Sequence, residues 1–408
     1  MQIRRTHFVF FAIDDVPFLD IELLLRGQVA LAPRRQLQAV SILKGRREPV
    51  GVDDVALLFG LAIDAWTPVA ELLRQPGWDL DVVARFLEHG LVVGDSDDAD
   101  IAELRRRDEQ LTASQWNLPA ALYHFMGRWS DIDVHASFPT TPAERDELFE
   151  ASGVAIREYI AKHGKPPPTF HSIAHPLARV VLPVVGRDGG VFAALARRRT
   201  TRAFDRDVPL AADDLALLLH QTFGCHGYLP IVDDVLALRK TSPSGGSLHP
   251  TEVYVLARHV SGLAPGLHHY NVRDHALDQV AAFDAARAAD LADELTAGQS
   301  YTRDAQALFL LTARFYRSYW KYRNHPKAYG VLLMDAGHLS QTFYLVCAEL
   351  GLGAFVTAAI NSHNIEKALG LDGFDEGAIA ILGCGAPAAD NHIDPRFLPY
   401  TPGGTNVP

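Results

Sequence analysis

Ala196-Arg197-Arg198-Arg199-Thr200-Thr201-Arg202-Ala203-Phe204-Asp205 places four arginines and two threonines where an apolar helical pattern ends and an extended run begins. Arginine side chains bind phosphate through paired, charge-assisted hydrogen bonds, and threonine hydroxyls add neutral donors. The stretch therefore predicts a site for a compact anion such as a nucleotide phosphate. The alternative interpretation is a solvated basic helix end.

A second stretch, Arg239 to Pro250, is a polar loop that contains Gly245-Gly246 and runs into an apparent strand, Glu252 to Ala257. Paired glycines let the backbone approach a planar ligand closely, and small serine hydroxyls supply donors. Together the two stretches predict a pocket for a ligand that has both a phosphate and a flat ring.

Composition bounds the class of protein. A chain of 408 residues with 48% hydrophobic and 21% charged residues predicts a globular protein of about two domains. The formal net charge of −11 argues against a general nucleic-acid or anionic-membrane binder. It leaves room for one local basic pocket.

The cysteines and the N-terminus bear on location. Cys225, Cys347 and Cys384 are isolated, which is typical of a reducing compartment and of neither a disulfide framework nor a zinc ribbon. The apolar run from His7 to Ile13 ends too early, at Asp14-Asp15, for a signal peptide. No stretch is apolar enough to span a bilayer. These features predict a cytoplasmic protein.

A metal site is not predicted. His171 and His175 have helical i, i+4 spacing, but Pro176 follows at once and no third ligand is evident.

Periodicity predicts three regions, with bounds 1–100, 101–185 and 186–408. The first reads as a strand, helices over 52–62, 69–74 and 79–89, and a strand over 91–93. That outline predicts a winged-helix-like domain, and it lacks the basic helix that DNA binding needs. It would either dock a peptide or serve only as a structural domain. The second region reads as a helical connector.

The third region alternates helices and strands and predicts an α+β fold with a mostly antiparallel sheet packed by helices. Its expected helices span 211–223, 283–295 and 335–350. Its expected strands span 252–259, 266–271, 275–277, 307–313 and 378–382.

A third motif completes the pattern: Tyr316-Arg317-Ser318-Tyr319-Trp320-Lys321-Tyr322, followed by Tyr329 and the stretch Met334 to Gln341. With the first two motifs, in this order between Val191 and Pro387, it resembles the FMN-dependent nitroreductase superfamily. The resemblance is stronger to its branch of SagB-type peptide-maturation dehydrogenases, the thiazole/oxazole-forming oxidases. It implies a C-terminal nitroreductase-like domain with FMN as cofactor.

The resemblance also implies cofactor-binding residues. Those that would hold the phosphate and ribityl chain of FMN are Arg198, Arg199, Thr200 and Arg202. Those that would lie along the pyrimidine edge of the ring are Pro243, Ser244, Gly245 and Ser247. Donors at that edge stabilise the charge that the ring gains on reduction.

The family's catalytic lysine and tyrosine correspond to Lys321 and Tyr322. Desaturation of a peptide ring or side chain needs a base for the Cα proton while hydride leaves for the flavin, and these two residue types serve in proton transfer. The alternative is a surface strip of aromatic and basic side chains.

The sequence departs from the nitroreductase pattern at Ala358-Ala359, where many members carry an acidic residue and a glycine near flavin N5. The backbone amides of this pair would have to serve instead. His249 stands where a glutamine is common. His338 is expected to be a buried structural histidine. The resemblance also places the helix over 335–350 at a homodimer interface, with FMN between the subunits.

The resulting prediction is an FMN-dependent oxidoreductase in the maturation of a ribosomally synthesised peptide, which oxidises azolines to azoles or carries out a related Cα–Cβ desaturation. Its partners would be a precursor peptide and other maturation enzymes such as a cyclodehydratase. Two alternatives stay open: an NAD(P)H-dependent nitro- or quinone reductase, and a non-catalytic peptide-docking scaffold.

Overall fold

The computed structural model describes residues 1–19, 31–135, 142–170, 174–233, 235–323 and 325–389. His171, of the histidine pair considered above, lies outside these residues. The chain divides into two compact units. Unit 1 comprises Met1–Arg128, Arg314–Leu332 and Leu371–Gly377. Unit 2 comprises the described parts of Trp129–Ala313, Leu333–Gly370 and Ala378–Pro408.

The N-terminal part of unit 1 is built on a three-stranded antiparallel sheet in the order β5-β1-β6. Ile3, on the central strand, is fully buried with Leu58, Val83 and Phe86 from the helices that follow. The side chain of Asp79 accepts a hydrogen bond from the Val82 amide at 2.8 Å and so caps helix α4, which begins at Leu80. The elements are β1 (Gln2–Arg5), α2 (Val52–Gly60), β5 (Thr67–Pro68), α3 (Val69–Leu72), α4 (Leu80–Glu88) and β6 (Val92–Gly94). The N-terminal strands are thus present, and the winged-helix assignment stays a prediction.

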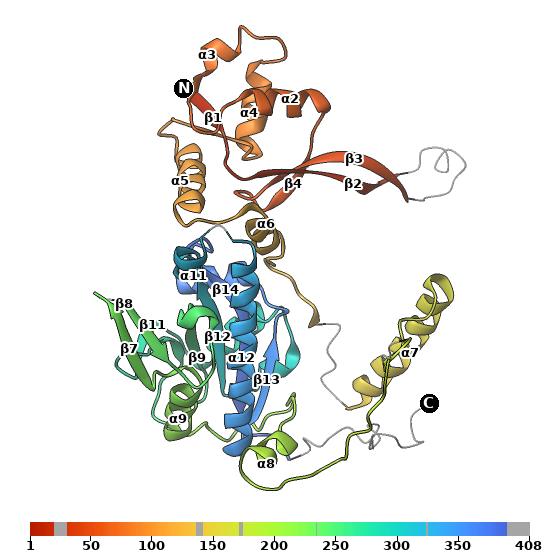
Figure 1. The fold of residues 1–408 in the computed structure, drawn as a ribbon, viewed down its shortest axis with the longest axis vertical. Helices are drawn as coiled ribbons and strands as arrows, with labels where there is room; N and C mark the ends of the chain where they lie inside the picture. Colours follow the sequence, from red (N-terminus) through yellow and green to blue (C-terminus); the bar gives the residue numbers. More distant parts are fainter. Residues whose placement is uncertain (20–30, 136–141, 171–173, 234, 324, 390–408) are drawn as a thin grey trace. The chain divides into compact units, whose positions relative to one another are not determined.

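A second sheet of unit 1 was not expected. Strands β2 (Val9–Leu19) and β3 (Leu31–Ser41) pair antiparallel over their whole length, and β4 (Arg46–Pro49) pairs antiparallel with the end of β3 as the third strand (Figure 1).

A second core of unit 1 joins segments far apart in the sequence. Trp116 lies between α5 (Ala99–Ala113) and α6 (Leu118–Met126). Its ring centroid is 4.6 Å from that of Phe315 and 5.1 Å from that of Tyr319, both on α11 (Phe315–Tyr322). The Trp116 indole donates to the Phe374 carbonyl at 3.0 Å. Helix α11 therefore packs into the same unit as the N-terminal elements.

Unit 2 is organised around a six-stranded sheet in the order β11-β10-β9-β12-β14-β13. The pairs β10–β11, β9–β10, β9–β12 and β13–β14 are antiparallel, which agrees with the predicted α+β class. Val255 on β9 pairs with Phe309 on β12, and both are completely buried. The strands are β9 (Thr251–Ala257), β10 (Gly266–Asn271), β11 (Ala276–Ala282), β12 (Ala307–Arg314), β13 (Gly353–Thr357) and β14 (Glu376–Gly385).

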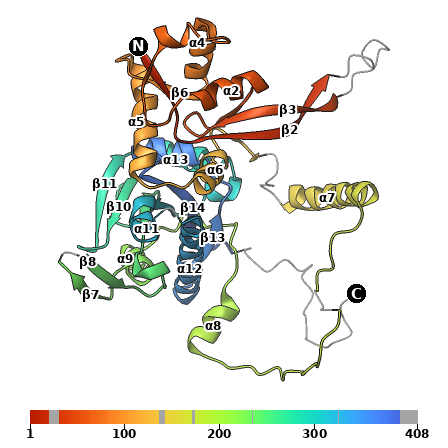
Figure 2. The ribbon, with the colours of Figure 1, turned by 45° about the horizontal axis from the view of Figure 1, so that its top comes forward.

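Two helices close the core of unit 2. Leu218 and Phe223 from α9 and Phe343 and Cys347 from α12 pack against the sheet, and both views show α12 running along it (Figures 1 and 2). Helix α12 carries the predicted apolar stretch 335–350. The other elements of this unit are α7 (Pro142–His163), α8 (Gly190–Arg197), α9 (Ala212–Phe223), β7 (Gly227–Val232), β8 (Val235–Arg239), η2 (Gly245–Ser247), α10 (Ala285–Leu295), η3 (Ser300–Thr302), α12 (Lys327–Glu349, whose first residues belong to unit 1) and α13 (Ser362–Leu369).

Candidate functional site

The arginine-rich segment is fixed to the sheet of unit 2. Helix α8 ends at Arg197, and the chain then runs extended beside β13. The Thr201 amide donates to the Ala354 carbonyl at 2.7 Å, and the Thr201 side chain is buried. Because side chains alternate along an extended segment, Thr200 and Arg202 are exposed on the other side.

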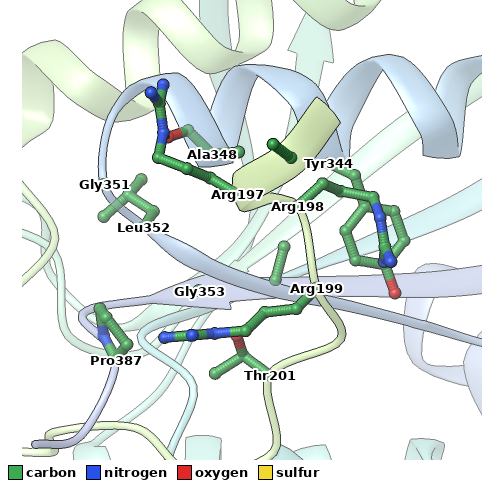
Figure 3. A pocket seen from close by; sticks show the side chains of 12 residues that line it. Arg197, Arg198, Arg199, Thr201, Tyr344, Ala348, Gly351, Leu352, Gly353 and Pro387 are labelled. Atoms are coloured by element: carbon green, nitrogen blue, oxygen red, sulfur yellow. The ribbon is translucent and has the colours of Figure 1, made fainter. Parts of the chain in front are cut away.

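This segment forms one wall of a pocket of about 260 Å³. The pocket's other walls come from the end of α12, from β13 and from the segment after β14. Figure 3 shows Arg199 extending toward Pro387 and Arg198 lying beside the Tyr344 ring, whereas Arg197 points away from both. The guanidinium of Arg197 is 2.7 Å from the Glu349 carboxylate.

Three of the four arginines fit an anion. Within the described part of the chain, Arg198, Arg199 and Arg202 have no carboxylate within 4.0 Å. The Arg198 guanidinium carbon lies 5.4 Å from the centroid of the Tyr344 ring, and that of Arg202 lies 5.6 Å from the Tyr301 ring. Aromatic faces hold a cation in place without neutralising it. The residues present therefore suit the phosphate of FMN.

The backbone of β13 comes unusually close to this segment. A Cβ atom built on Gly353 would lie 2.6 Å from Cγ2 of Thr201. Only glycine therefore allows the pocket's two walls to meet here without a shift.

The predicted ring-binding loop is held by a buried carboxylate. Asp335 on α12, 4% exposed, accepts hydrogen bonds from the Ser244 hydroxyl and from the Gly245 amide, the latter at 3.2 Å. The Ser247 hydroxyl donates to the Leu238 carbonyl at 2.9 Å. Ser247 and His249 have φ of +58° and +45°, which non-glycine residues seldom adopt.

The same helix contacts the loop a turn further on. His338 Nδ1 lies 3.3 Å from the Pro243 carbonyl. The His338 side chain is half-buried rather than fully buried.

The segment Ala358-Ala359 directly follows β13. The Ala359 amide donates to Thr357 Oγ1 at 3.1 Å, and the Ala359 carbonyl accepts from Gln299 Nε2 at 2.6 Å. Both main-chain groups of Ala359 thus have partners inside unit 2.

Lys321 and Tyr322 lie at the end of α11 in unit 1, and Lys321 Nζ is 5.8 Å from the centroid of the Tyr322 ring. The same helix buries Tyr319, and this burial raises the pKa of its phenol. The FMN-binding residues and the catalytic residues predicted by resemblance therefore belong to different units, and their roles stay predictions.

Sequence reasoning missed four residues that hold these segments: Tyr344, Asp335, Tyr301 and Gln299. The first two lay within the expected helix 335–350, whose polar and aromatic positions among apolar ones were the available signal. Tyr301 and Gln299 follow α10 in a stretch whose sequence carries no pattern that distinguishes it from an ordinary loop.

Within the described residues, no helix combines the length and apolar character that a bilayer-spanning segment requires.

Comparison with known proteins confirms the resemblance to the nitroreductase superfamily. Residues 195–386 match the model of the Nitroreductase family. The C-terminal part of this chain is a nitroreductase domain.

Two curated relatives are informative. The trifolitoxin-processing protein TfxB of Rhizobium leguminosarum bv. trifolii is 35% identical over 144 residues, 35% of this chain and 38% of the relative. MJ1384 of Methanocaldococcus jannaschii, whose nitroreductase assignment is provisional, is 26% identical over 175 residues, 43% of this chain and 81% of the relative. The chain thus spans little more than a third of TfxB.

Among solved structures, the Escherichia coli microcin synthetase McbBCD complex with truncated pro-MccB17 bound contains a chain that is 20% identical. The match covers 69% of this chain and 94% of that one, with a TM-score of 0.48.

Proposed function

We propose that this protein is an FMN-dependent dehydrogenase or oxidase that acts on a ribosomally synthesised peptide, by oxidising azolines to azoles or by a related Cα–Cβ desaturation. The observation that carries the FMN assignment is the pocket of the nitroreductase domain, where arginines without carboxylate partners line the wall. The identity with a trifolitoxin-processing protein supports a peptide as the substrate.

Different residues of the chain would bind the cofactor and transfer the substrate proton. Arg198, Arg199 and Arg202 would bind the phosphate, and the loop held by Asp335 would present its donors to the ring. Bound FMN would supply the acceptor for the hydride. Lys321 and Tyr322, by resemblance, would take up the proton from the substrate Cα.

A homodimer belongs to the proposal as well. Leu333 and Met334 on α12 are 37% and 62% exposed, although the helix is otherwise largely apolar. Exposed apolar side chains on one helix favour contact with another protein surface. A sedimentation measurement that gives a monomer at micromolar concentration would contradict this part.

The decisive experiment has two stages. The absorption spectrum of the purified protein, with and without added FMN, tests for a bound flavin. Mass spectrometry of an azoline-containing peptide incubated with the holoprotein then tests for the loss of two hydrogen atoms. Lys321→Ala should abolish that loss, and Lys367→Ala, an exposed lysine on α13, should not. A holoprotein whose Lys321→Ala variant oxidises the peptide normally would contradict the catalytic assignment.

The similarity to MJ1384 favours a second candidate function, that of an NAD(P)H-dependent nitro- or quinone reductase. Rapid turnover of a nitroaromatic compound with NADPH would favour it. A protein that stays colourless with added FMN would favour the third alternative, a non-catalytic scaffold that docks a peptide.

A further inference from the structure

The β7–β8 hairpin lies at the margin of unit 2 and forms a separate two-stranded sheet (Figures 1 and 2). Tyr228 and Leu229 are neighbours on β7, so their side chains point to opposite faces, and they are 68% and 62% exposed. Val232 and Leu236 are 58% and 41% exposed. A two-stranded sheet is at best marginally stable by itself in water, and exposed apolar patches mark interaction sites. The hairpin is therefore a candidate docking surface.

One face of the hairpin is hollowed. A pocket of about 390 Å³ is lined by residues of both strands and by Ser247. Leu229 pairs with Ala237, and Gly227 pairs with Arg239. These four residues share one face, because they lie two positions apart on each strand. The glycine and the alanine leave the space that larger side chains would fill.

Arg239 gives this hollow a positive charge. Its side chain is exposed, and none of the described residues forms an ion pair or a hydrogen bond with its guanidinium group. Gly227, directly across from it, has no side chain to cover it. An arginine without a partner favours a carboxylate, which it binds through paired hydrogen bonds. The hollow thus combines apolar walls with a site for one negative charge.

The hairpin is fixed to the rest of unit 2 beside this hollow. The Leu238 carbonyl accepts hydrogen bonds from the Ser247 hydroxyl at 2.9 Å and from His249 Nε2 at 3.0 Å. Two donors on one carbonyl hold the end of β8 in place. The hollow is therefore formed before a ligand arrives, as most ligand sites are.

The size of the surface indicates what covers it. The strands have only six and five residues, whereas a stable interface between two protein subunits uses roughly 20–30 residues on each side. The hollow, in contrast, falls within the range of about 300–1,000 Å³ that is usual for ligand pockets. A short segment of peptide therefore fits this face better than a second copy of the chain does.

We propose that this face of the β7–β8 hairpin docks an extended peptide segment that carries an apolar side chain and, two positions away, an aspartate or a glutamate. The apolar side chain enters the hollow beside Leu229 and Ala237, and the carboxylate accepts hydrogen bonds from Arg239. The spacing follows because side chains two positions apart in an extended peptide point the same way, as the two pairs of the hairpin do. That the segment belongs to the precursor peptide rests on the proposed function.

Fluorescence anisotropy of the full-length protein with two dye-labelled synthetic peptides tests the docking. One peptide has a Leu-Thr-Glu core between serines, and the other has Leu-Thr-Gln. The wild-type protein should bind the glutamate peptide about fivefold more tightly, as a partly solvated ion pair predicts, and added salt should reduce this preference. Arg239→Gln should abolish the preference. Arg179→Gln, which removes an exposed arginine between α7 and α8, should keep it.

A second variant fills the hollow without removing a polar group. A Cβ atom on Gly227 would lie 3.8 Å from the Cβ of Arg239 and 3.9 Å from its Cδ, which is ordinary contact. Valine also suits a strand, so Gly227→Val should unfold at the wild-type temperature. It should nevertheless weaken the binding of both peptides about tenfold or more, because their leucine loses its place.

Activity gives an independent measurement. The holoprotein is assayed with an azoline-containing peptide that has the same Leu-Thr-Glu core. Arg239→Gln should raise KM about fivefold and leave kcat within about twofold, because docking binds the substrate and the transition state equally.

The outcomes separate this proposal from the proposed function. Equal binding of the two peptides by the wild-type protein, or a preference that survives Arg239→Gln, would overturn the docking site. So would a Gly227→Val variant that binds both peptides normally but sediments as a monomer where the wild-type protein is a dimer, because a second copy would then be the occupant. The expected binding by a protein that takes up no FMN would overturn the proposed function and support the docking site. An active enzyme whose KM is unchanged by Arg239→Gln would overturn the docking site alone.

Discussion

Asp335 accepts a hydrogen bond from the Gly245 amide at 3.2 Å, and its other oxygen accepts from Ser244. The carboxylate is almost completely buried, and it connects α12 to the loop predicted to border the flavin ring. The conformation of this loop therefore depends on a residue about ninety positions further along the chain.

Asp335→Ala should lower the free energy of unfolding by about 2–3 kcal/mol, because two donors lose their acceptor in a largely dry environment. Hydrogen exchange of the amides in 244–249 should accelerate as well. Asp278→Ala, which removes an exposed contact with Asn271, is the control and should change stability by less than about 0.5 kcal/mol. Equal stability of the two variants would contradict the role of Asp335.

Arg198→Gln and Arg202→Gln should each weaken FMN binding roughly 10- to 100-fold, because each removes a charge-assisted hydrogen bond to phosphate. Fluorescence titration at two salt concentrations measures this. Arg197→Gln should have a much smaller effect, since Arg197 is already paired with Glu349. Unchanged FMN affinity in both Arg198 and Arg202 variants would contradict the phosphate site.

Replacement by alanine should change the free energy of unfolding in opposite directions at two glycines. Gly353→Ala places a Cβ 2.6 Å from Thr201 Cγ2 and should lower the free energy of unfolding by about 1–3 kcal/mol. Gly337→Ala lies in the middle of α12, with no atom within 4 Å of the new Cβ. It should raise the free energy of unfolding by about 0.5–1 kcal/mol. Thermal unfolding measures both changes. A Gly353→Ala variant as stable as Gly337→Ala would contradict the close approach of β13 to Thr201.

His124 should make the stability of unit 1 dependent on pH. Burial lowers the pKa of His124 from 6.5 to about 3, and its ring bonds to Tyr329 and to the Gly373 carbonyl. The folded pKa lies below the unfolded one, so only the unfolded state gains this proton just below pH 6.5. The contribution is complete above pH 6.5 and is lost as the pH falls toward about 3, at a slope of up to ~1.4 kcal/mol per pH unit.

His124→Gln should remove that slope, although it lowers stability at neutral pH. Denaturant unfolding at a series of pH values below 6.5 measures it. His163→Gln, at an exposed position on α7, should keep the wild-type slope. Identical slopes in the two variants would show that another group titrates.

Local patterns in the sequence predicted much of unit 2. The apolar runs of β9 and β12 and the apolar stretch of α12 have strong signals, and the structure contains all three. The α9 helix was also predicted, and it begins one residue later than expected, with Ala211 at the N-cap position.

Unit 1 was harder to predict because much of its order is non-local. In the β2–β3 hairpin, Asp14 pairs with Gln36 and Asp15 with Arg35, so charged residues interrupt the alternation that marks a strand. The packing of Trp116 against Phe315 joins residues nearly two hundred positions apart, and no local pattern encodes such a contact.

In the candidate site, too, some features follow from local sequence patterns and others only from tertiary contacts. The arginine segment and the glycine loop have compositions that point to a phosphate and a flat ring. The residues that orient them, such as Gln299 and Tyr344, are ordinary in sequence and become informative only through their tertiary contacts.

The aromatic cluster around Trp116 has a practical consequence for dissecting this protein. Because Phe315, Tyr319 and Phe374 come from much later in the sequence, a fragment that ends at Arg128 would contain Trp116 but lack the residues against which it packs. The behaviour of such a fragment would reflect its exposed Trp116 rather than peptide recognition. Point substitutions in the intact polypeptide are the sounder way to assign tasks to its two units.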